Sequence, residues 1–201
     1  MVDVAPLSRR AGRTIKGEQA KLELADHALR ELARLGYAHT SMRDIATAAD
    51  MNLGRLNYYF EDKTDLIVFT IRRFKQTFVA RLAEAVERGG SVDAVIEVLV
   101  DSATKGAAVH RFWYDLRTQS LFDPAFRDVV GEIEADMAAM TIRTLRLVAP
   151  EKDSTQFLSL ANSLIDGVFF RGMQASLRGD VGAADKMRAE LAMAAAHYRA
   201  S

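Results

Sequence analysis

Apolar residues along the chain recur every three or four positions in long blocks, which is the pattern of amphipathic helices. The first clear block runs from Ile15 to Leu32. Gly36 follows it and supplies the left-handed conformation that commonly ends a helix. No run of residues typical of a strand stands out. The pattern therefore predicts an all-α fold.

Two short helices joined by a tight turn are predicted after Gly36. Thr40 and Ser41 are both favourable N-cap residues, and Asp44 follows Ser41 by three positions, as the acidic member of a capping box does. Asn52 is a further favourable N-cap residue, so a second short helix is expected to begin directly after it. Two short helices in this arrangement have the layout of a helix-turn-helix.

The second short helix carries an outward face with the chemistry needed to read DNA. Leu53, Leu56 and Phe60 are spaced three and four apart and should face inward, which leaves the opposite side in solvent. On that side Arg55 can pair with a guanine edge and Asn57 with adenine, while neighbouring hydroxyls and cations can hold phosphates. The DNA-contacting residues are predicted to be Thr40, Ser41, Arg43, Asn52, Arg55, Asn57, Tyr58, Tyr59 and Lys63.

A longer spaced signature runs through the same region, from about Ile15 to Phe78. It consists of Gly36-Tyr37, Thr40-Ser41-Met42-Arg43-Asp44-Ile45-Ala46, Ala48-Ala49, Gly54, Leu56, Tyr59-Phe60, Lys63 and Asp65-Leu66. In these positions the chain resembles the TetR family of transcriptional regulators. The resemblance implies an N-terminal three-helix DNA-binding domain and a C-terminal helical bundle for ligand binding and dimerisation. Asn57 stands where relatives often have a tyrosine that touches DNA, so the operator sequence is left open.

The rest of the chain continues as a series of helices. A connecting helix is expected from Lys63 until Gly89-Gly90, followed by a helix from about Val92. The domains predicted from these breaks are a flexible tail over residues 1–12, a helix-turn-helix domain over 13–62, a connecting helix over 63–88, and a ligand-binding and dimerisation domain over 89–201.

A stripe of apolar residues begins at Asp123-Pro124 and continues at spacings of three and four through Met137 and Met140. Such a stripe is either plain core or part of a cavity wall, and methionine and aromatic walls adapt to apolar or flat ligands. Polar residues nearby could fix one group of such a ligand. The pocket residues predicted are His110, Trp113, Arg117, Ile133, Met137, Met140, Asp166 and Phe170.

The last two helices are expected from about Thr155 to Leu177 and from Ala183 to Tyr198, with a tight hairpin between them. They carry more apolar surface than one subunit needs, and in the family such a pair docks against its twofold mate as a four-helix bundle. The predicted dimer-interface residues are Leu164, Val168, Met187, Leu191, Ala194 and Tyr198.

Composition narrows the class of protein further. Basic and acidic residues both number 27, so attraction to nucleic acid must come from a local patch and not from net charge. Cysteine is absent and no apolar segment has the length of a membrane span, which fits a cytoplasmic protein. The four histidines are far apart, and no metal-binding or nucleophilic constellation is present. We therefore expect no enzyme activity, no metal and no cofactor.

Together these observations predict a ligand-responsive regulator that binds double-stranded DNA as a homodimer. The most favoured form is a repressor of a palindromic operator, released by a small hydrophobic or aromatic effector. The alternative is a module of the same fold that binds a ligand or partner protein and has lost DNA binding. Loss of DNA binding on Arg55→Ala and Tyr58→Ala would separate the two hypotheses.

Overall fold

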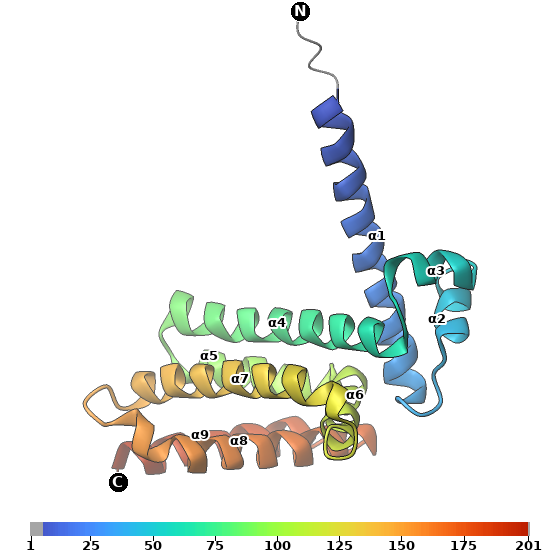
Figure 1. Cartoon of the computed structure of the whole chain (residues 1–201). Helices are drawn as coiled ribbons and strands as arrows, with labels where there is room; N and C mark the ends of the chain where they lie inside the picture. The colour runs from blue at the N-terminus through green and yellow to red at the C-terminus, as the bar shows by residue number, and fades with distance from the viewer. Residues whose placement is uncertain (1–5, 201) are drawn as a thin grey trace, which may run out of the picture. The chain divides into compact units, whose positions relative to one another are not determined.

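The structure of the protein is a computed structural model that describes residues 6–200, with side chains from residue 17 onward and residue 89 excepted. Every regular element in this part of the chain is helical, which confirms the predicted all-α fold (Figure 1). The elements are α1 (Pro6–Leu35), α2 (Met42–Ala48), α3 (Leu53–Tyr59), α4 (Lys63–Gly89), α5 (Val92–Thr104), α6 (Ala107–Gln119), the short 3-10 helix η1 (Pro124–Phe126), α7 (Arg127–Val148), α8 (Ser154–Leu177) and α9 (Ala183–Ala200).

The helix α1 begins earlier than the sequence suggested. It starts at Pro6, so the tail predicted over residues 1–12 is wrong for residues 6–12. Proline is favoured at the first position of a helix because its backbone angle is already helical and its missing N–H would have no partner there. The remainder of the predicted tail, residues 1–5, lies outside the described residues.

The chain divides into two compact units, and the division falls inside α4, between Ile71 and Arg72. In the first unit α1 packs on α2 and α2 packs on α3. The side chains that fill this unit are those spaced three and four apart on each helix, as expected for amphipathic helices. The large residues buried here are Leu24, Leu32, Ile45, Leu56, Phe60, Leu66, Ile67 and Ile71.

The predicted helix ends in the first unit are confirmed. Gly36 has a φ of 80°, in the left-handed region, and its N–H donates to the Leu32 carbonyl over 2.8 Å. Ser41 is the N-cap of α2 and forms the full capping box with Asp44. Asn52 is the N-cap of α3, where its side-chain oxygen accepts from the Arg55 N–H over 2.8 Å. These local bonds fix where α2 and α3 begin.

Asp50 in the turn between α2 and α3 has a φ of 52°, a left-handed conformation that a Cβ-bearing residue resists. We expect Asp50→Gly to raise the free energy of unfolding by up to about 1 kcal/mol, and Asp50→Val to lower it by a similar amount or more. Urea denaturation followed by circular dichroism measures both. Ala48→Gly, in the ordinary helical backbone of α2, is the control and should lower the free energy of unfolding by about 1 kcal/mol. Equal effects of glycine at positions 48 and 50 would contradict the left-handed backbone conformation at Asp50.

The second unit is a bundle formed by the rest of α4 and helices α5 to α9. In Figure 1 helices α7, α8 and α9 run across the view, while α6 is seen nearly end-on. Asp123 caps η1, and the predicted stripe that follows is buried at Phe126, Val130 and Ile133. The main core of the unit consists of Phe78, Leu82, Val95, Ile96, Leu99, Val100, Ala103, Ala107, Met140, Val168, Phe169, Met173, Met187 and Leu191.

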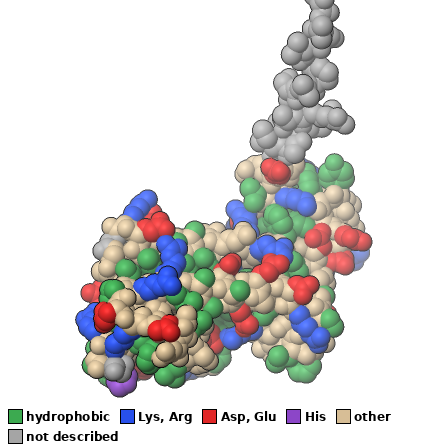
Figure 2. Space-filling model, turned by 60° about the vertical axis from the view of Figure 1, so that its left-hand side comes forward, with side chains coloured by type: hydrophobic (Ala, Val, Ile, Leu, Met, Phe, Trp, Pro, Cys, Tyr) green, Lys and Arg blue, Asp and Glu red, His purple; other side chains and the backbone are tan. Residues whose placement is uncertain are grey.

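The surface carries both signs of charge. On the face drawn in Figure 2, basic and acidic side chains are interspersed with hydrophobic ones. This mixture agrees with the equal numbers of basic and acidic residues in the sequence. None of the helices in the described part of the chain combines the length and apolar character that crossing a bilayer requires.

Candidate functional site

The outward face of α3 is the first candidate site. Arg55, Asn57 and Tyr58 are exposed, and the Tyr58 side chain is 83% exposed although it is a large aromatic group. Its ring packs edge-on against the ring of Tyr59, with centroids 5.1 Å apart. Leu56, on the opposite side of the same helix, is fully buried. The helix therefore presents a guanidinium, an amide and a phenol from one rigid and well-anchored support.

The residues that flank α3 are placed differently from one another. Ser41 and Arg43 are exposed at the start of α2. Lys63 is half-buried. Its ammonium donates to the Tyr37 carbonyl over 2.6 Å and lies 4.1 Å from the centre of the Tyr37 ring. This contact ties the start of α4 to the turn after α1.

Thr40 is a correction to the predicted set of DNA contacts. Its side chain is 2% exposed, and its hydroxyl donates to the Gly36 carbonyl over 2.8 Å. Thr40 thus closes the turn between α1 and α2 and presents no group at the surface. A threonine that precedes an N-cap serine has the same sequence signal whether it faces solvent or the turn, which is why the sequence did not exclude it.

The capping box of α2 is also an electrostatic feature of this surface. The Ser41 hydroxyl donates to the Asp44 carboxylate over 2.6 Å, and the Ser41 backbone N–H donates to it over 2.8 Å. These two bonds lower the pKa of Asp44, and the nearby Arg34 and Arg43 lower it further. Asp44 is therefore held ionised where it stabilises the start of α2.

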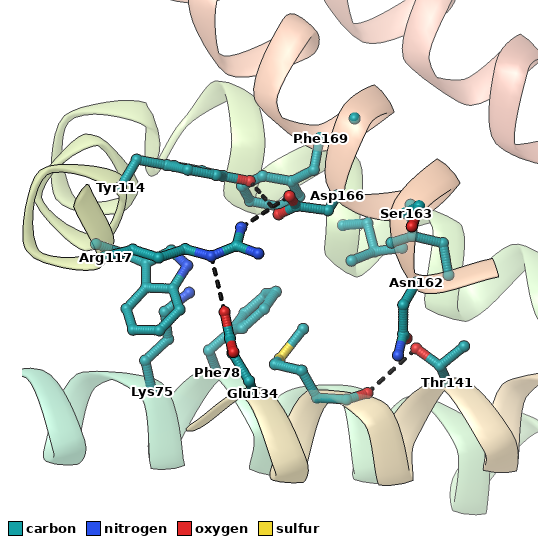
Figure 3. A pocket seen from close by; sticks show the side chains of 15 residues that line it. Lys75, Phe78, Tyr114, Arg117, Glu134, Thr141, Asn162, Ser163, Asp166 and Phe169 are labelled. Atoms are coloured by element: carbon teal, nitrogen blue, oxygen red, sulfur yellow. Dashed lines mark hydrogen bonds and ion pairs between the residues drawn. The ribbon is translucent and has the colours of Figure 1, made fainter. Parts of the chain in front are cut away.

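The second candidate site is a cavity of about 450 Å³ inside the second unit (Figure 3). Its size falls in the range of small-molecule sites. Helix α4 contributes Lys75 to the wall, α6 contributes Trp113, and α7 and α8 supply most of the remainder. The full lining is Lys75, Phe78, Leu99, Trp113, Tyr114, Arg117, Glu134, Met137, Thr141, Asn162, Ser163, Ile165, Asp166, Gly167 and Phe169.

A network of polar side chains crosses one side of the cavity (Figure 3). Arg117 donates to the Asp166 carboxylate over 2.8 Å and to Glu134 over 2.8 Å, so that one guanidinium serves two carboxylates. The Tyr114 hydroxyl donates to the other oxygen of Asp166, also over 2.8 Å. Burial, the charge of Asp166 and this hydrogen bond raise the pKa of Tyr114 well above its usual range. The phenol is therefore a neutral donor at any physiological pH.

Another part of the cavity wall is aromatic and holds the ammonium of Lys75. The Lys75 ammonium lies 4.5 Å from the centre of the Trp113 ring, 5.2 Å from that of Phe78 and 5.8 Å from that of Phe74. The His110 ring packs behind them, with its centroid 4.8 Å from that of Phe78. Burial and the charges of Lys75 and Arg81 hold the pKa of His110 far below its usual range. His110 is thus a neutral aromatic residue at physiological pH.

The predicted pocket residues divide into two groups. Trp113, Arg117, Met137 and Asp166 line the cavity, while Phe170 lines a hollow beside it that Tyr114, Arg117 and Asp166 share. The other predicted residues are corrections, because they are core residues that are not among the residues lining the cavity: His110, Ile133 and Met140. Sequence reasoning missed the other residues of the lining, which are Lys75, Phe78, Leu99, Tyr114, Glu134, Thr141, Asn162, Ser163, Ile165, Gly167 and Phe169.

The predicted dimer interface also needs correction. Most of its residues are buried inside the single chain, because α8 and α9 pack on each other and on α5. The residues wrongly assigned to the interface are Val168, Met187, Leu191 and Tyr198. Leu164 is 38% exposed and Ala194 is partly buried. The strongly exposed apolar residues of these helices include Leu160 on α8 and Met193 on α9.

Three comparisons relate the chain to known proteins. Residues 24–68 match the family described as "Bacterial regulatory proteins, tetR family". The HTH-type transcriptional regulator BetI of Burkholderia cenocepacia is 25% identical over 179 residues, which is 85% of this chain and 90% of that protein.

Two solved structures have a similar fold. A TetR transcription regulator from Haloarcula marismortui superposes with a TM-score of 0.71 at 18% identity, over 91% of this chain and 97% of that one. A putative transcriptional regulator from Saccharomonospora viridis, crystallised with choline, superposes with a TM-score of 0.72 at 22% identity, over 87% of this chain and 94% of that one. The sequence relatives are regulators, in agreement with the expectation that this chain is not an enzyme.

Proposed function

We propose that this chain is a transcriptional regulator of the TetR type, a repressor that binds a palindromic operator as a homodimer and is released by a small effector. The observation that carries the proposal is the exposed face of α3, on which Arg55, Asn57 and Tyr58 project from a helix whose other side is buried. An exposed tyrosine and asparagine on such a short helix contribute nothing to the core, and their chemistry matches the edges of base pairs.

In this proposal the residues of the first unit have different roles at the DNA. Arg55 and Asn57 read bases in the major groove, and Tyr58 and Tyr59 contact phosphates or a thymine methyl. Ser41 and Arg43 are exposed at the start of α2 and are further proposed contacts. The side-chain oxygen of Asn52 caps α3, so its amide nitrogen is the group proposed to contact DNA. Lys63 is already bound to Tyr37, so its proposed role is to position α4 beside the reading helix.

The proposed dimer forms through the exposed apolar faces of α8 and α9. Leu160 and Leu164 lie one turn apart on α8 and are 68% and 38% exposed, and Met193 on α9 is 70% exposed. Two such faces related by a twofold axis would bury these residues against each other. A twofold pair of reading helices then matches a palindrome whose half-sites are about 34 Å apart or somewhat more.

The proposed effector site is the cavity of the second unit, with the aromatic and apolar walls expected for a hydrophobic or aromatic ligand. Helix α4 is the proposed coupling element. Its first residues, including Leu66 and Ile67, are buried in the first unit, and Lys75 and Phe78 line the cavity in the second. A ligand that prefers a shifted α4 by about 1 to 3 kcal/mol would move the reading helices away from operator spacing.

Fluorescence anisotropy with labelled DNA from the region upstream of the chain's own gene tests the proposal. We expect binding with a stoichiometry of two chains per palindrome, and release of the DNA when a ligand that occupies the cavity is titrated in. Unchanged DNA affinity with every ligand that binds the cavity would contradict the induction mechanism. Absence of binding to any palindrome would favour the ligand-binding module instead.

A further inference from the structure

Lys75 is the one charged group lining the cavity, among the described residues, that forms neither a hydrogen bond nor an ion pair. The side chain is 4% exposed, and it makes no hydrogen bond or ion pair with any residue that the structure describes. Its ammonium lies against the Trp113, Phe78 and Phe74 rings. Lys75 is one of the residues that line the cavity (Figure 3). Ring faces attract a cation but accept none of its three N–H bonds as a carboxylate does.

The other charges of the cavity are already engaged. Asp166 and Glu134 both accept from Arg117, and Asp166 also accepts from Tyr114. The Glu134 side chain is 48% exposed, so solvent screens its charge. Asp166 therefore compensates the ammonium only in part: the pKa of Lys75 is lowered to about 7, mainly by burial and also by the charge of Arg117, although Asp166 opposes the shift.

The position of Lys75 also bears on which ligands the cavity excludes. A box of aromatic rings is the usual receptor for a quaternary ammonium ligand. In this chain the box of Trp113, Phe78 and Phe74 already holds the ammonium of Lys75. A ligand such as choline, which the Saccharomonospora viridis protein binds, would have to displace a covalently tethered cation of the same charge.

We propose that the effector of this protein is an anion, a small apolar or aromatic carboxylate whose charged group pairs with the Lys75 ammonium. The apolar body of the ligand packs on Trp113, Met137 and Phe169, which line the same cavity. This inference rests on the proposed function, because it takes the cavity as the effector site. Beyond the proposed function, it specifies that the ligand is negatively charged and that Lys75 is the residue that selects it.

The test compares three probes of similar size: phenylacetate, its neutral analogue phenylacetamide, and the cation choline. Trp113 is the only tryptophan of the chain, so its fluorescence reports on the cavity without background. We expect phenylacetate to bind at least about tenfold more tightly than either other probe, and Lys75→Met to remove this preference while binding of phenylacetamide remains. Lys105→Met changes a lysine that is 78% exposed and is the matched control.

The dependence on pH provides a measurement on the unaltered chain. A bound carboxylate raises the pKa of the ammonium, so binding takes up a proton above about pH 7, and phenylacetate affinity should fall between about pH 7 and pH 9. Of the other groups facing Lys75, His110 is neutral and Tyr114 keeps its proton over this range. The Asp166 and Glu134 carboxylates form ion pairs with Arg117. Calorimetry in two buffers of different ionisation enthalpy measures the proton uptake.

The inference is overturned if phenylacetate binds no more tightly than phenylacetamide, or if choline binds most tightly. It is also overturned if Lys75→Met, shown to be folded by circular dichroism, weakens both aromatic probes equally. Operator binding by the unliganded chain depends on α3 and is measured separately. A chain that binds its operator but prefers a neutral or cationic probe would leave the proposed function intact and would refute only the proposal that the effector is an anion.

Discussion

Arg55→Ala is expected to weaken operator binding about tenfold to 100-fold while leaving the fold unchanged. Arg55 is exposed on α3, and its backbone N–H rather than its side chain takes part in the cap with Asn52. Its guanidinium is therefore free to pair with a guanine edge, a contact worth about 1 to 3 kcal/mol of discrimination between bases. Anisotropy titrations with the operator and with single-base variants of each half-site measure both affinity and specificity.

The salt dependence of binding distinguishes a base contact from a phosphate contact at Arg55. A reader of bases should lose specificity at one base pair, whereas a phosphate contact should weaken all sequences alike and reduce the slope of log affinity against log salt by about 1. Arg146→Ala, an exposed arginine in the last turn of α7, is the control and should have no effect. An unchanged affinity for every operator variant after Arg55→Ala would refute a role of α3 in reading DNA.

The structure of the first unit was predictable because it is set by interactions between residues close together in the sequence. Gly36, Ser41 and Asn52 each set a helix end through bonds to backbone groups within four residues, so that residue type and spacing alone define the structure. The orientation of α3 then follows from the period of the helix, which buries Leu56 and exposes Arg55. Thr40 is the exception, because its burial depends on a turn whose path the sequence pattern does not specify.

The cavity was predictable only in part because it depends on contacts between distant helices. Met137 and Trp113 belong to apolar patterns that could be assigned to a wall. Lys75 could not be assigned to the wall, because lysine is among the residues least often buried and the neighbouring sequence does not indicate a cavity. The pairing of Arg117 with Asp166 likewise joins positions 49 residues apart, which no local pattern reports.

The proposed dimer face shows a different limit of sequence reasoning. Apolar periodicity on α9 correctly identifies a buried face, and the structure buries Met187 and Leu191 within the chain itself. Periodicity gives the same signal for a side packed on its own subunit and a side packed on a partner. Only the three-dimensional arrangement reveals that Leu160 and Met193 remain uncovered.

Replacing Leu160 by glutamate is therefore expected to convert the proposed dimer to a monomer and to weaken operator binding by about 100-fold or more. A carboxylate within the proposed α8–α9 interface would be buried there at the cost of its hydration, and the copies on the two chains would add like-charge repulsion. The fold should survive, because Leu160 is 68% exposed in the single chain. Each separated chain would retain one reading helix and lose the gain in affinity that two linked half-sites provide.

Light scattering coupled to size-exclusion chromatography measures the mass of Leu160→Glu, and anisotropy measures its operator affinity. Val181→Glu introduces the same charge at a residue that is 99% exposed on the hairpin between α8 and α9, and should leave both unchanged. A Leu160→Glu chain that stays dimeric would place the interface on another surface. A monomer that binds the palindrome as tightly as the native chain would refute the requirement for a twofold pair of reading helices, and with it the link between dimerisation and repression.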